Sequence, residues 1–426
     1  MSYISRLCFA LLMFSATTLI AQQQESFLIK NVQLHIGNGT VIDKGAIGVK
    51  DGKIKDIFKA DENINESAYS KVVDGNGQYV YPSIIAPNTQ LGIAEIESVR
   101  ATNDFMEVGL FNPNIRSIIA YNADSDVLPT ITYNGVLIAQ TTPQGGRISG
   151  QSSVVKLQAE DWKAAVIAQD NAVHLNFPAR FYHTGWWAEP GKIQGSKGYE
   201  KDVESVKVYF DHAWAYAQNS QPETKNLKFE VMRELFNKKK KLYIHANEAL
   251  AIMDAVNLLK PYNVDMVLVG GIESYMIMDF LKENNIPVIY MHVHDLPNHA
   301  DIDVDQYYKT PVQLQQAGIK VGLGLIGYWQ VRNLPFVAGN TVAFGATKAE
   351  ALSSITLSTA EILGIADRVG SLEVGKEATF FVSQGDVLDM RSSVVTAAFI
   401  QGKPIRLSSR QQALYEKYMD KFGFEK

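Results

Sequence analysis

The sequence predicts an α/β protein: a TIM-like (β/α)8 barrel plus a small composite β-sandwich formed by both ends of the chain. Three observations carry this prediction. The chain has 426 residues, enough for one large barrel or two ordinary domains. Short apolar runs alternate with amphipathic helical stretches through its middle. Patterns typical of β-strands stand at both ends.

The first 21 residues differ from the rest of the chain. Arg6 precedes the apolar run "LCFALLMFSATTLIA", and Ala21 is followed by "QQQE". This pattern predicts a signal peptide over residues 1–21 and an exported, periplasmic protein, with an N-terminal membrane anchor as the alternative. Gln22 stands where a lipoprotein would need cysteine. Cleavage would remove Cys8, the only cysteine, so we expect no disulfides.

The composition excludes several classes of partner. The chain is 46% hydrophobic and 20% charged, which is ordinary for a globular protein. Loss of the signal segment removes one basic and no acidic residue, so the net charge changes from −5 to 39 − 45 = −6. Mild acidity without basic clusters argues against nucleic acid. No second long apolar stretch follows, so we expect no membrane contact after cleavage.

The β-sandwich is predicted from residues 26–83 and 366–408. The first segment contains "SFLIKNVQLHIGNG" and "GAIGVKDGKIKDIFKA", with a hairpin signal at Asp51-Gly52. The second contains "EATFFVSQG" and "VVTAAFIQGKPIRL", with a turn at the Gln-Gly pair in the latter. Because chain ends usually lie close together, the two segments are expected to form one unit. Residues 409–426 read as a polar, exposed helix.

The barrel is predicted over residues 84–365. Buried runs separated by amphipathic helices are typical of parallel strands with crossover helices. The runs are "GVLIAQTT", "AVHLNF", "KLYIHA", "VDMVLVGG", "IPVIYMHVH" and "IKVGLGLIG".

Several segments resemble the metal-dependent amidohydrolase superfamily, in particular its imidazolonepropionase-like group. "DGKIKDI" resembles the first hairpin of that family, "VDGNGQYVYPSIIAPNTQLG" the strand entering the barrel, and "YIHANEALAI" the fifth strand. "ALSSITLSTAEILGIADRVGSLEVGKEA" is similar to the end of the family's chain. The resemblance implies one or two divalent metals at the C-terminal mouth of the barrel, where an activated water attacks a carbonyl carbon.

The ligand set that the resemblance implies is largely missing. The family's first strand carries His-x-His, where this chain has Asn88 and Gln90. Side-chain amides are poor zinc ligands, so these two residues, which their spacing puts on one face of the strand, read as neutral polar groups that line a pocket. The fifth-strand histidine is present as His245. Glycines, Gly270 and Gly271, stand where the sixth-strand histidine is expected.

The eighth strand completes this comparison. Ile326 or Gly327 falls where the family's aspartate would be. Zinc sites need three or four donors, so we expect the binuclear centre to be absent. His245 alone then reads either as a hydrogen-bonded polar group or as part of a different site.

A non-standard metal site is the alternative. His292, His294, Asp295 and His299 end the predicted seventh strand. Residues two apart leave the same side of a strand, so His292 and His294 could join His245 or Asp295 around one divalent metal, zinc. The other reading is a polar loop that binds no metal.

Further residues are candidates for a pocket. "FPARFYHTGWWAEPGK" brings His183, Trp186 and Trp187 into a loop that could either stack on a ligand ring or pack on itself. Arg147 could pair with a substrate carboxylate. The remaining candidates follow the sixth and eighth strands and are Glu273 and Asn333.

Two functions remain open. The first is an exported hydrolase of C–N bonds in small amides, cyclic amides or dipeptide-like substrates, with a rebuilt or single-metal site. The second is a catalytically inactive protein of the same fold that binds a small ligand, forms a homo-oligomer or partners an active relative. The missing ligands favour the second. No G-x-S-x-G elbow, mature cysteine or dinucleotide-binding glycine pattern supports other chemistry.

Overall fold

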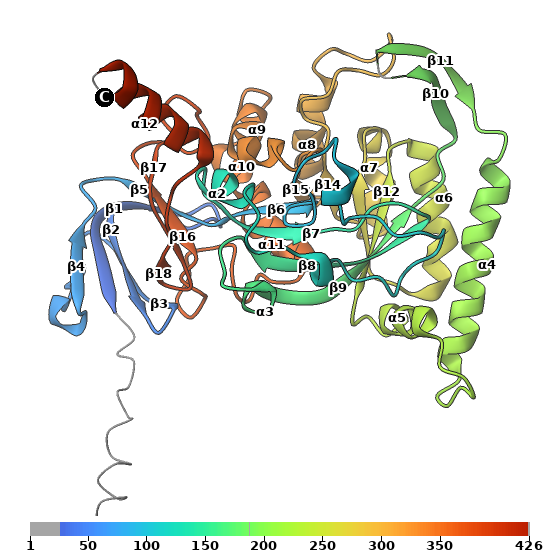
Figure 1. Ribbon diagram of the computed structural model, residues 1–426, viewed down its shortest axis with the longest axis horizontal. Coiled ribbons are helices and arrows are strands. Elements are labelled where there is room, and N and C mark those ends of the chain that lie inside the picture. Colours follow the sequence, from blue (N-terminus) through green and yellow to red (C-terminus); the bar gives the residue numbers. More distant parts are fainter. Residues whose placement is uncertain (1–25, 187, 425–426) are drawn as a thin grey trace, which may run out of the picture.

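A computed structural model describes residues 26–186 and 188–424. The predicted signal peptide and Trp187 lie outside these residues. An eight-stranded barrel sheet occupies the centre of the molecule, with a second sheet on one side and long helices on the other (Figure 1).

The barrel sheet has the strand order β15-β14-β13-β12-β9-β8-β7-β6 and is nearly closed. Its interior is filled with apolar side chains and with a buried polar group on several strands. The strands are β6 (Ile84–Thr89), β7 (Val136–Thr141), β8 (Ile148–Lys156), β9 (Val166–Asn176), β12 (Lys241–Ala246), β13 (Met266–Gly270), β14 (Val288–Tyr290) and β15 (Val321–Leu323).

One strand of this sheet departs from the predicted parallel pattern. β8 pairs antiparallel with both β7 and β9, whereas the other pairs are parallel. Only residues 142–147 join β7 to β8. A parallel crossover needs a dozen or more residues, so this connection permits only an antiparallel return. The sequence analysis did not predict the antiparallel direction of β8, because it used the apolar runs and not the length of the connections between them.

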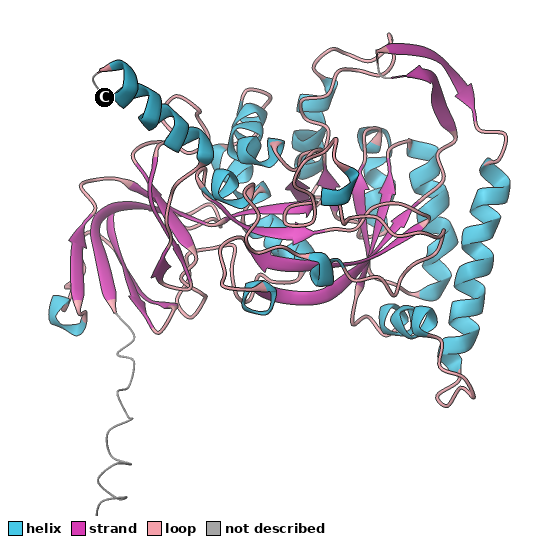
Figure 2. Ribbon diagram, viewed as in Figure 1, coloured by secondary structure: helices cyan, strands magenta, loops and turns pink. Residues whose placement is uncertain are grey.

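Helices follow the later barrel strands and cover the outside of the sheet (Figure 2). α4 and α5 pack against β9 and β12 through a cluster that includes Phe210 and Leu235. The helices are α2 (Leu128–Thr132), α3 (Trp162–Ala165), α4 (Tyr199–Gln218), α5 (Leu227–Phe236), α6 (Ala249–Leu259), α7 (Met278–Glu283), α8 (Gln306–Gln316), α9 (Leu334–Val342), α10 (Lys348–Ser354), α11 (Leu357–Leu363) and α12 (Arg410–Phe422).

Strands from both ends of the chain pair in the second sheet, whose main path is β18-β17-β16-β5-β1-β2-β3, with β4 paired to β1. The blue and red strands of Figure 1 therefore lie side by side. The division of the chain into domains stays a prediction. The strands are β1 (Phe27–His35), β2 (Val41–Lys50), β3 (Lys53–Phe58), β4 (Lys71–Asp74), β5 (Tyr79–Pro82), β16 (Phe380–Ser383), β17 (Val395–Ile400) and β18 (Lys403–Pro404).

Both predicted hairpin turns are confirmed. Asp51 and Gly52 join β2 to β3 with φ of 54° and 73°, and Gln401 and Gly402 join β17 to β18 with φ of 49° and 73°. Positive φ at both central residues is typical of the type I′ turn, whose twist matches that of the paired strands.

Two further segments complete the fold. The predicted aromatic loop is instead an antiparallel hairpin of β10 (Phe181–Trp186) and β11 (Glu189–Gly195), which stands beside the start of α4 (Figure 1). Within the segment predicted as an exposed C-terminal helix, the structure has α12, which buries none of its residues. Among the described residues, no helix is long and apolar enough to cross a membrane.

Candidate functional site

A cavity of about 650 Å³ lies at the C-terminal ends of β9, β12 and β13. This is the end of a barrel where ligand sites are usually built. Polar side chains from several strands and loops share its wall with apolar ones. The polar lining residues are Asn88, Asn176, Tyr182, His183, His245, Asn247, Glu248, Glu273, His292, Asn298 and His299.

Asn88 lies in the cavity wall, but Gln90 does not. Asn88 has φ of 48°, and the pairing of β6 with β7 shifts register between Ala86 and Thr89. This irregularity breaks the two-residue alternation of the strand, and β6 ends before Gln90. The predicted arrangement, with Asn88 and Gln90 on one face, is therefore wrong.

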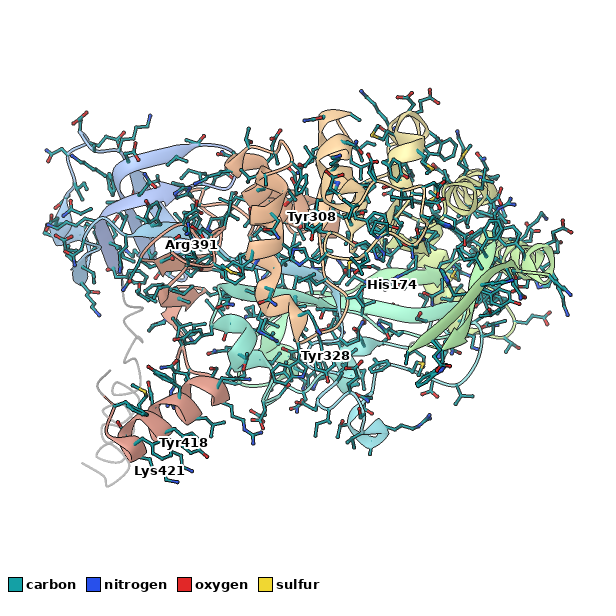
Figure 3. The ribbon with its side chains drawn as sticks, turned by 90° about the horizontal axis from the view of Figure 1, so that it is seen from above. His174, Tyr308, Tyr328, Arg391, Tyr418 and Lys421 are labelled. Carbon is teal, nitrogen blue, oxygen red and sulfur yellow. The ribbon has the colours of Figure 1, made fainter. Side chains whose placement is uncertain are left out.

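The His245 ring is held by a second histidine below the cavity. Nε2 of His245 lies 2.9 Å from Nδ1 of His174, and Nε2 of His174 lies 2.8 Å from Oγ of Ser152. His174 is fully buried inside the barrel, on the green strand that carries its label in Figure 3. The sequence analysis did not single out His174.

The chain of hydrogen bonds continues across two more strands. Nε2 of Gln140 donates to Oγ of Ser152 at 3.0 Å, and the backbone N–H of Asn88 donates to Oε1 of Gln140 at 3.1 Å. Five neighbouring strands, β6, β7, β8, β9 and β12, thus contribute one group each. Such a network is stable when every buried member has a partner.

Burial keeps both histidines of this chain neutral. Desolvation lowers the pKa of His174 well below its ordinary value, and the neighbouring His245 lowers it further. Desolvation also lowers the pKa of His245 to about 4. Two adjacent imidazolium ions in the barrel interior would repel each other, so the neutral pair is the stable state near pH 7.

His292 and His294 do not converge on one point. Nδ1 of His292 lies 2.6 Å from Oδ2 of Asp295, and its Nε2 lies 3.1 Å from Oδ1 of Asn247. Nε2 of His294 instead lies 2.7 Å from Nδ2 of Asn340 on α9, and His294 is not in the cavity wall. β14 ends at Tyr290, so the strand alternation that predicted a shared side does not extend to these two residues.

The β10–β11 hairpin forms one wall of the cavity. Phe181, Tyr182 and His183 line it, as does Ile193 from β11. Trp186 is 56% exposed near the hairpin tip and lies outside the cavity wall. Of the predicted aromatic candidates, the structure therefore places His183 at the site and Trp186 away from it, and Trp187 is not among the described residues.

Two carboxylates also line the cavity. Glu248 accepts hydrogen bonds from the backbone N–H groups of Arg180 (2.8 Å) and Phe181 (3.1 Å). Glu273 accepts one from the N–H of Ala249, the first residue of α6, at 2.8 Å. Glu273 was predicted as a pocket residue, and Glu248 was not. Both carboxylates therefore add negative charge to the cavity wall.

Arg147 and Asn333 have other roles. Arg147 forms an ion pair with Asp202 at 3.3 Å and donates to the backbone oxygen of Asn176 at 3.1 Å. Asn333 precedes α9 at the end of a short 3-10 helix. Neither residue lines the cavity, so the predicted pairing of Arg147 with a substrate carboxylate has no support from the geometry.

Comparison with known proteins agrees with this barrel architecture. Residues 215–405 match the model of the amidohydrolase family. An amidohydrolase from Thermotoga maritima MSB8 has a TM-score of 0.77 at 21% identity, covering 89% of this chain and 99% of that chain. Over residues 215–405 this chain is similar to the amidohydrolase family, and over nearly its whole length it shares the fold of that structure.

Further solved structures are similar over nearly their whole chains. A prolidase complexed with N-methylphosphonate-L-proline gives a TM-score of 0.54 at 15% identity, covering 89% of this chain and 99% of that one. An adenosine deaminase from Xanthomonas campestris with bound zinc gives 0.53 at 15% identity, covering 94% and 99%. These likenesses show the shared fold.

One curated relative matches over a short stretch. The amidohydrolase tasK of Hapsidospora irregularis is 31% identical over 120 residues, which are 24% of this chain and 11% of that protein. This chain therefore matches only about a tenth of the length of that relative.

Members of the amidohydrolase family usually bind divalent metals, and the residues described here do not fit such a centre. Within residues 26–186 and 188–424, no three His, Cys, Asp or Glu side chains are grouped so that they could hold a metal ion. Gly270 and Ile326 line the cavity where a histidine and an aspartate were expected. Nε2 of His245 already faces His174.

The sequence analysis did not identify several residues at this site. His174 and Asn176 lie two apart on β9 and both point toward the barrel interior or its mouth. The apolar run "AVHLNF" had been predicted as a strand, so its alternation was the available signal. Asn247 and Asn298 lie in loops and had no comparable signal.

Proposed function

We propose that this protein binds a small organic ligand in the barrel-mouth cavity and does not catalyse the metal-dependent hydrolysis usual in its superfamily. The hydrogen bond between His174 and His245 carries this proposal. This bond occupies Nε2 of His245, the one histidine that matches a metal-ligand position of the superfamily. A zinc site needs three or four donors, and the surrounding positions offer an amide, a glycine and an isoleucine.

The ligand class is proposed from the cavity and from the superfamily. A volume of about 650 Å³ suits a molecule of amino-acid to dipeptide size. The similar structures include a prolidase with a proline-containing ligand and an adenosine deaminase. We therefore propose small amides, cyclic amides or dipeptide-like compounds as ligands, bound in an exported protein after cleavage of residues 1–21. Homo-oligomerisation, or pairing with an active relative, belongs to the same proposal.

A second candidate is a single-metal hydrolase. The observation that favours it is that His245 and His292 line the same cavity. A metal there would have to bind the unpartnered Nδ1 of His245 or displace His174 from its Nε2, and it would have to displace either Asp295 or Asn247 from His292.

One experiment separates the two functions. Protein purified without a histidine tag is analysed for metal per chain and then assayed, with and without added zinc, on a panel of amides, lactams and dipeptides. Thermal unfolding with the same panel reports binding. We expect stabilisation by at least one compound, no stoichiometric metal and no turnover. Turnover that His245→Ala abolishes would contradict the proposal and favour the hydrolase.

A further inference from the structure

The direction of each hydrogen bond beneath the cavity follows from the first one. The backbone N–H of Asn88 can only donate, so the side-chain oxygen of Gln140 accepts and its nitrogen must face Ser152. Turning the amide of Gln140 around would therefore lose the bond from Asn88 and set two N–H donors face to face.

The remaining bonds then have one consistent arrangement. Oγ of Ser152 accepts from Gln140, and its own proton has Nε2 of His174 as its available acceptor. Because Nε2 of His174 accepts that proton, the ring carries its own proton on Nδ1, which donates to Nε2 of His245. A neutral His245 must then carry its proton on Nδ1.

The free nitrogen of His245 faces the ligand space. The ring lines the cavity, and its Nδ1 has no partner among the described residues. Nδ1 is not fully buried, so it is accessible from the cavity. The floor of the cavity thus presents an N–H donor whose direction is set by the barrel.

The charges of the wall restrict the matching acceptor. Glu248 and Glu273 line the cavity, and neither lysine nor arginine does so in the described part of the chain. Nδ1 of His292, which also lines the cavity, lies 2.6 Å from the carboxylate of Asp295. An anion would therefore meet carboxylates without a free counter-charge.

Resting on the proposed binding function, we infer that Nδ1–H of His245 donates to the carbonyl oxygen of an uncharged ligand, an amide or a lactam, and that His174 and Ser152 are positioning residues that hold this tautomer. The apolar part of the ligand lies against Phe177, Phe181 and Tyr182, which line the same cavity. An aromatic wall with few oriented polar groups is typical of small-molecule sites.

The tautomer is tested first, by ring-nitrogen NMR of protein labelled with ¹⁵N in histidine. The His245 signals are assigned by their loss in His245→Asn. We expect a neutral ring protonated on Nδ1. His174→Asn should keep this state, because its side-chain N–H can take the place of Nδ1–H, whereas His174→Leu should shift the proton to Nε2. Ser152→Ala provides a second variant if the leucine protein does not fold. A wild-type His245 protonated on Nε2 would overturn the inference.

The ligand class is tested with three matched probes: benzamide, benzoate and benzylamine. We expect benzamide to move the His245 signals and to bind more tightly than the two charged compounds. Its affinity should fall about tenfold in His174→Leu and change little in His174→Asn, since one hydrogen bond is at stake. Tighter binding of benzoate or benzylamine, or no binding of benzamide, would overturn the ligand class. Binding with His245 protonated on Nε2 would overturn the inference but leave the proposed function standing.

Discussion

Nδ1 of His174 lies 2.9 Å from Nε2 of His245, and this contact joins two strands at the bottom of the cavity. His174 in turn bonds Ser152, which bonds Gln140. A histidine whose ring nitrogen is held in this way is a hydrogen-bonding group of the barrel interior. Under the function proposed above, His245 keeps the position of a metal-ligand histidine of the amidohydrolase family but serves as a hydrogen-bonding group.

Restoring two histidines on the first barrel strand should not restore a metal centre. In Asn88→His with Gln90→His, only position 88 lines the cavity, and His174 still occupies Nε2 of His245. Elemental analysis after dialysis against zinc should find well under one zinc per chain. Adding His174→Leu to the pair frees Nε2 and serves as the matched comparison. Stoichiometric zinc in the double variant, without the third substitution, would contradict the account.

The stability of the protein should fall as the pH falls from about 6.5 to about 4. The pKa of His174 and that of His245 are lowered from 6.5 in the folded state, to about 4 for His245. The unfolded chain therefore binds more protons in this window, and the free energy of unfolding decreases as the pH falls, by at most about 1.4 kcal/mol per pH unit for each group. Above pH 7 this contribution is fully present.

His174→Asn isolates the histidine contribution to this pH dependence. The variant removes one of the two titrating groups, so its free energy of unfolding should depend less steeply on pH between 6.5 and 4. Urea unfolding of both proteins across this range measures the difference. Equal slopes for the two proteins would mean that His174 does not resist protonation as its burial implies.

Glu248→Ala should loosen the base of the β10–β11 hairpin. The Glu248 carboxylate accepts N–H bonds from Arg180 and Phe181, where the hairpin begins. Bonds to a charged group contribute about 1.5–3 kcal/mol each, so local opening should become easier by a few kcal/mol. Hydrogen exchange of the amides at residues 180 and 181 would rise. Glu248→Gln, which keeps one acceptor oxygen, should show an intermediate rise, and unchanged exchange in the alanine variant would refute this role.

The turn at Gly52 should tolerate alanine less well than the turn at Gly77. Both glycines have a positive φ, 73° and 75°, so alanine costs about 1 kcal/mol at either position. A Cβ at Gly52 would lie 3.0 Å from the backbone oxygen of Gln401, whereas nothing lies within 4 Å at Gly77. Gly52→Ala should therefore be the more destabilised variant in thermal unfolding. Equal losses would show that the contact with Gln401 relaxes freely.

The sequence predicted the barrel and the strands at both chain ends because these depend on local patterns. Apolar runs, amphipathic helices and the Asp51-Gly52 pair each act over a few residues. The antiparallel direction of β8 follows from a connection of six residues between β7 and β8, which is a matter of chain length and not of residue type. The sequence analysis predicted a loop at Phe181–Gly195, because it used the aromatic residues of this segment as a sign of ligand contact and not as a sign of strands.

The candidate site was predicted less completely, for a physical reason. Asn88, His183, His245, Glu273 and His292 follow predicted strands or lie in the aromatic segment, and the structure brings them to one cavity. Residue spacing alone could not show that the positive φ of Asn88 breaks the alternation of the strand. Nor could it show that the His294 side chain contacts α9. Those outcomes depend on contacts between segments distant in sequence. The pairing of His174 with His245, 71 residues apart, is of the same kind.

The central claim is that His174, and not a metal, occupies Nε2 of His245. Crystals grown with excess zinc and measured at the zinc absorption edge test it directly, because anomalous scattering locates the metal without reference to activity. The account predicts no anomalous peak within bonding distance of His245 and a His174–His245 hydrogen bond in the density. A fully occupied zinc bonded to Nε2 of His245 would contradict it.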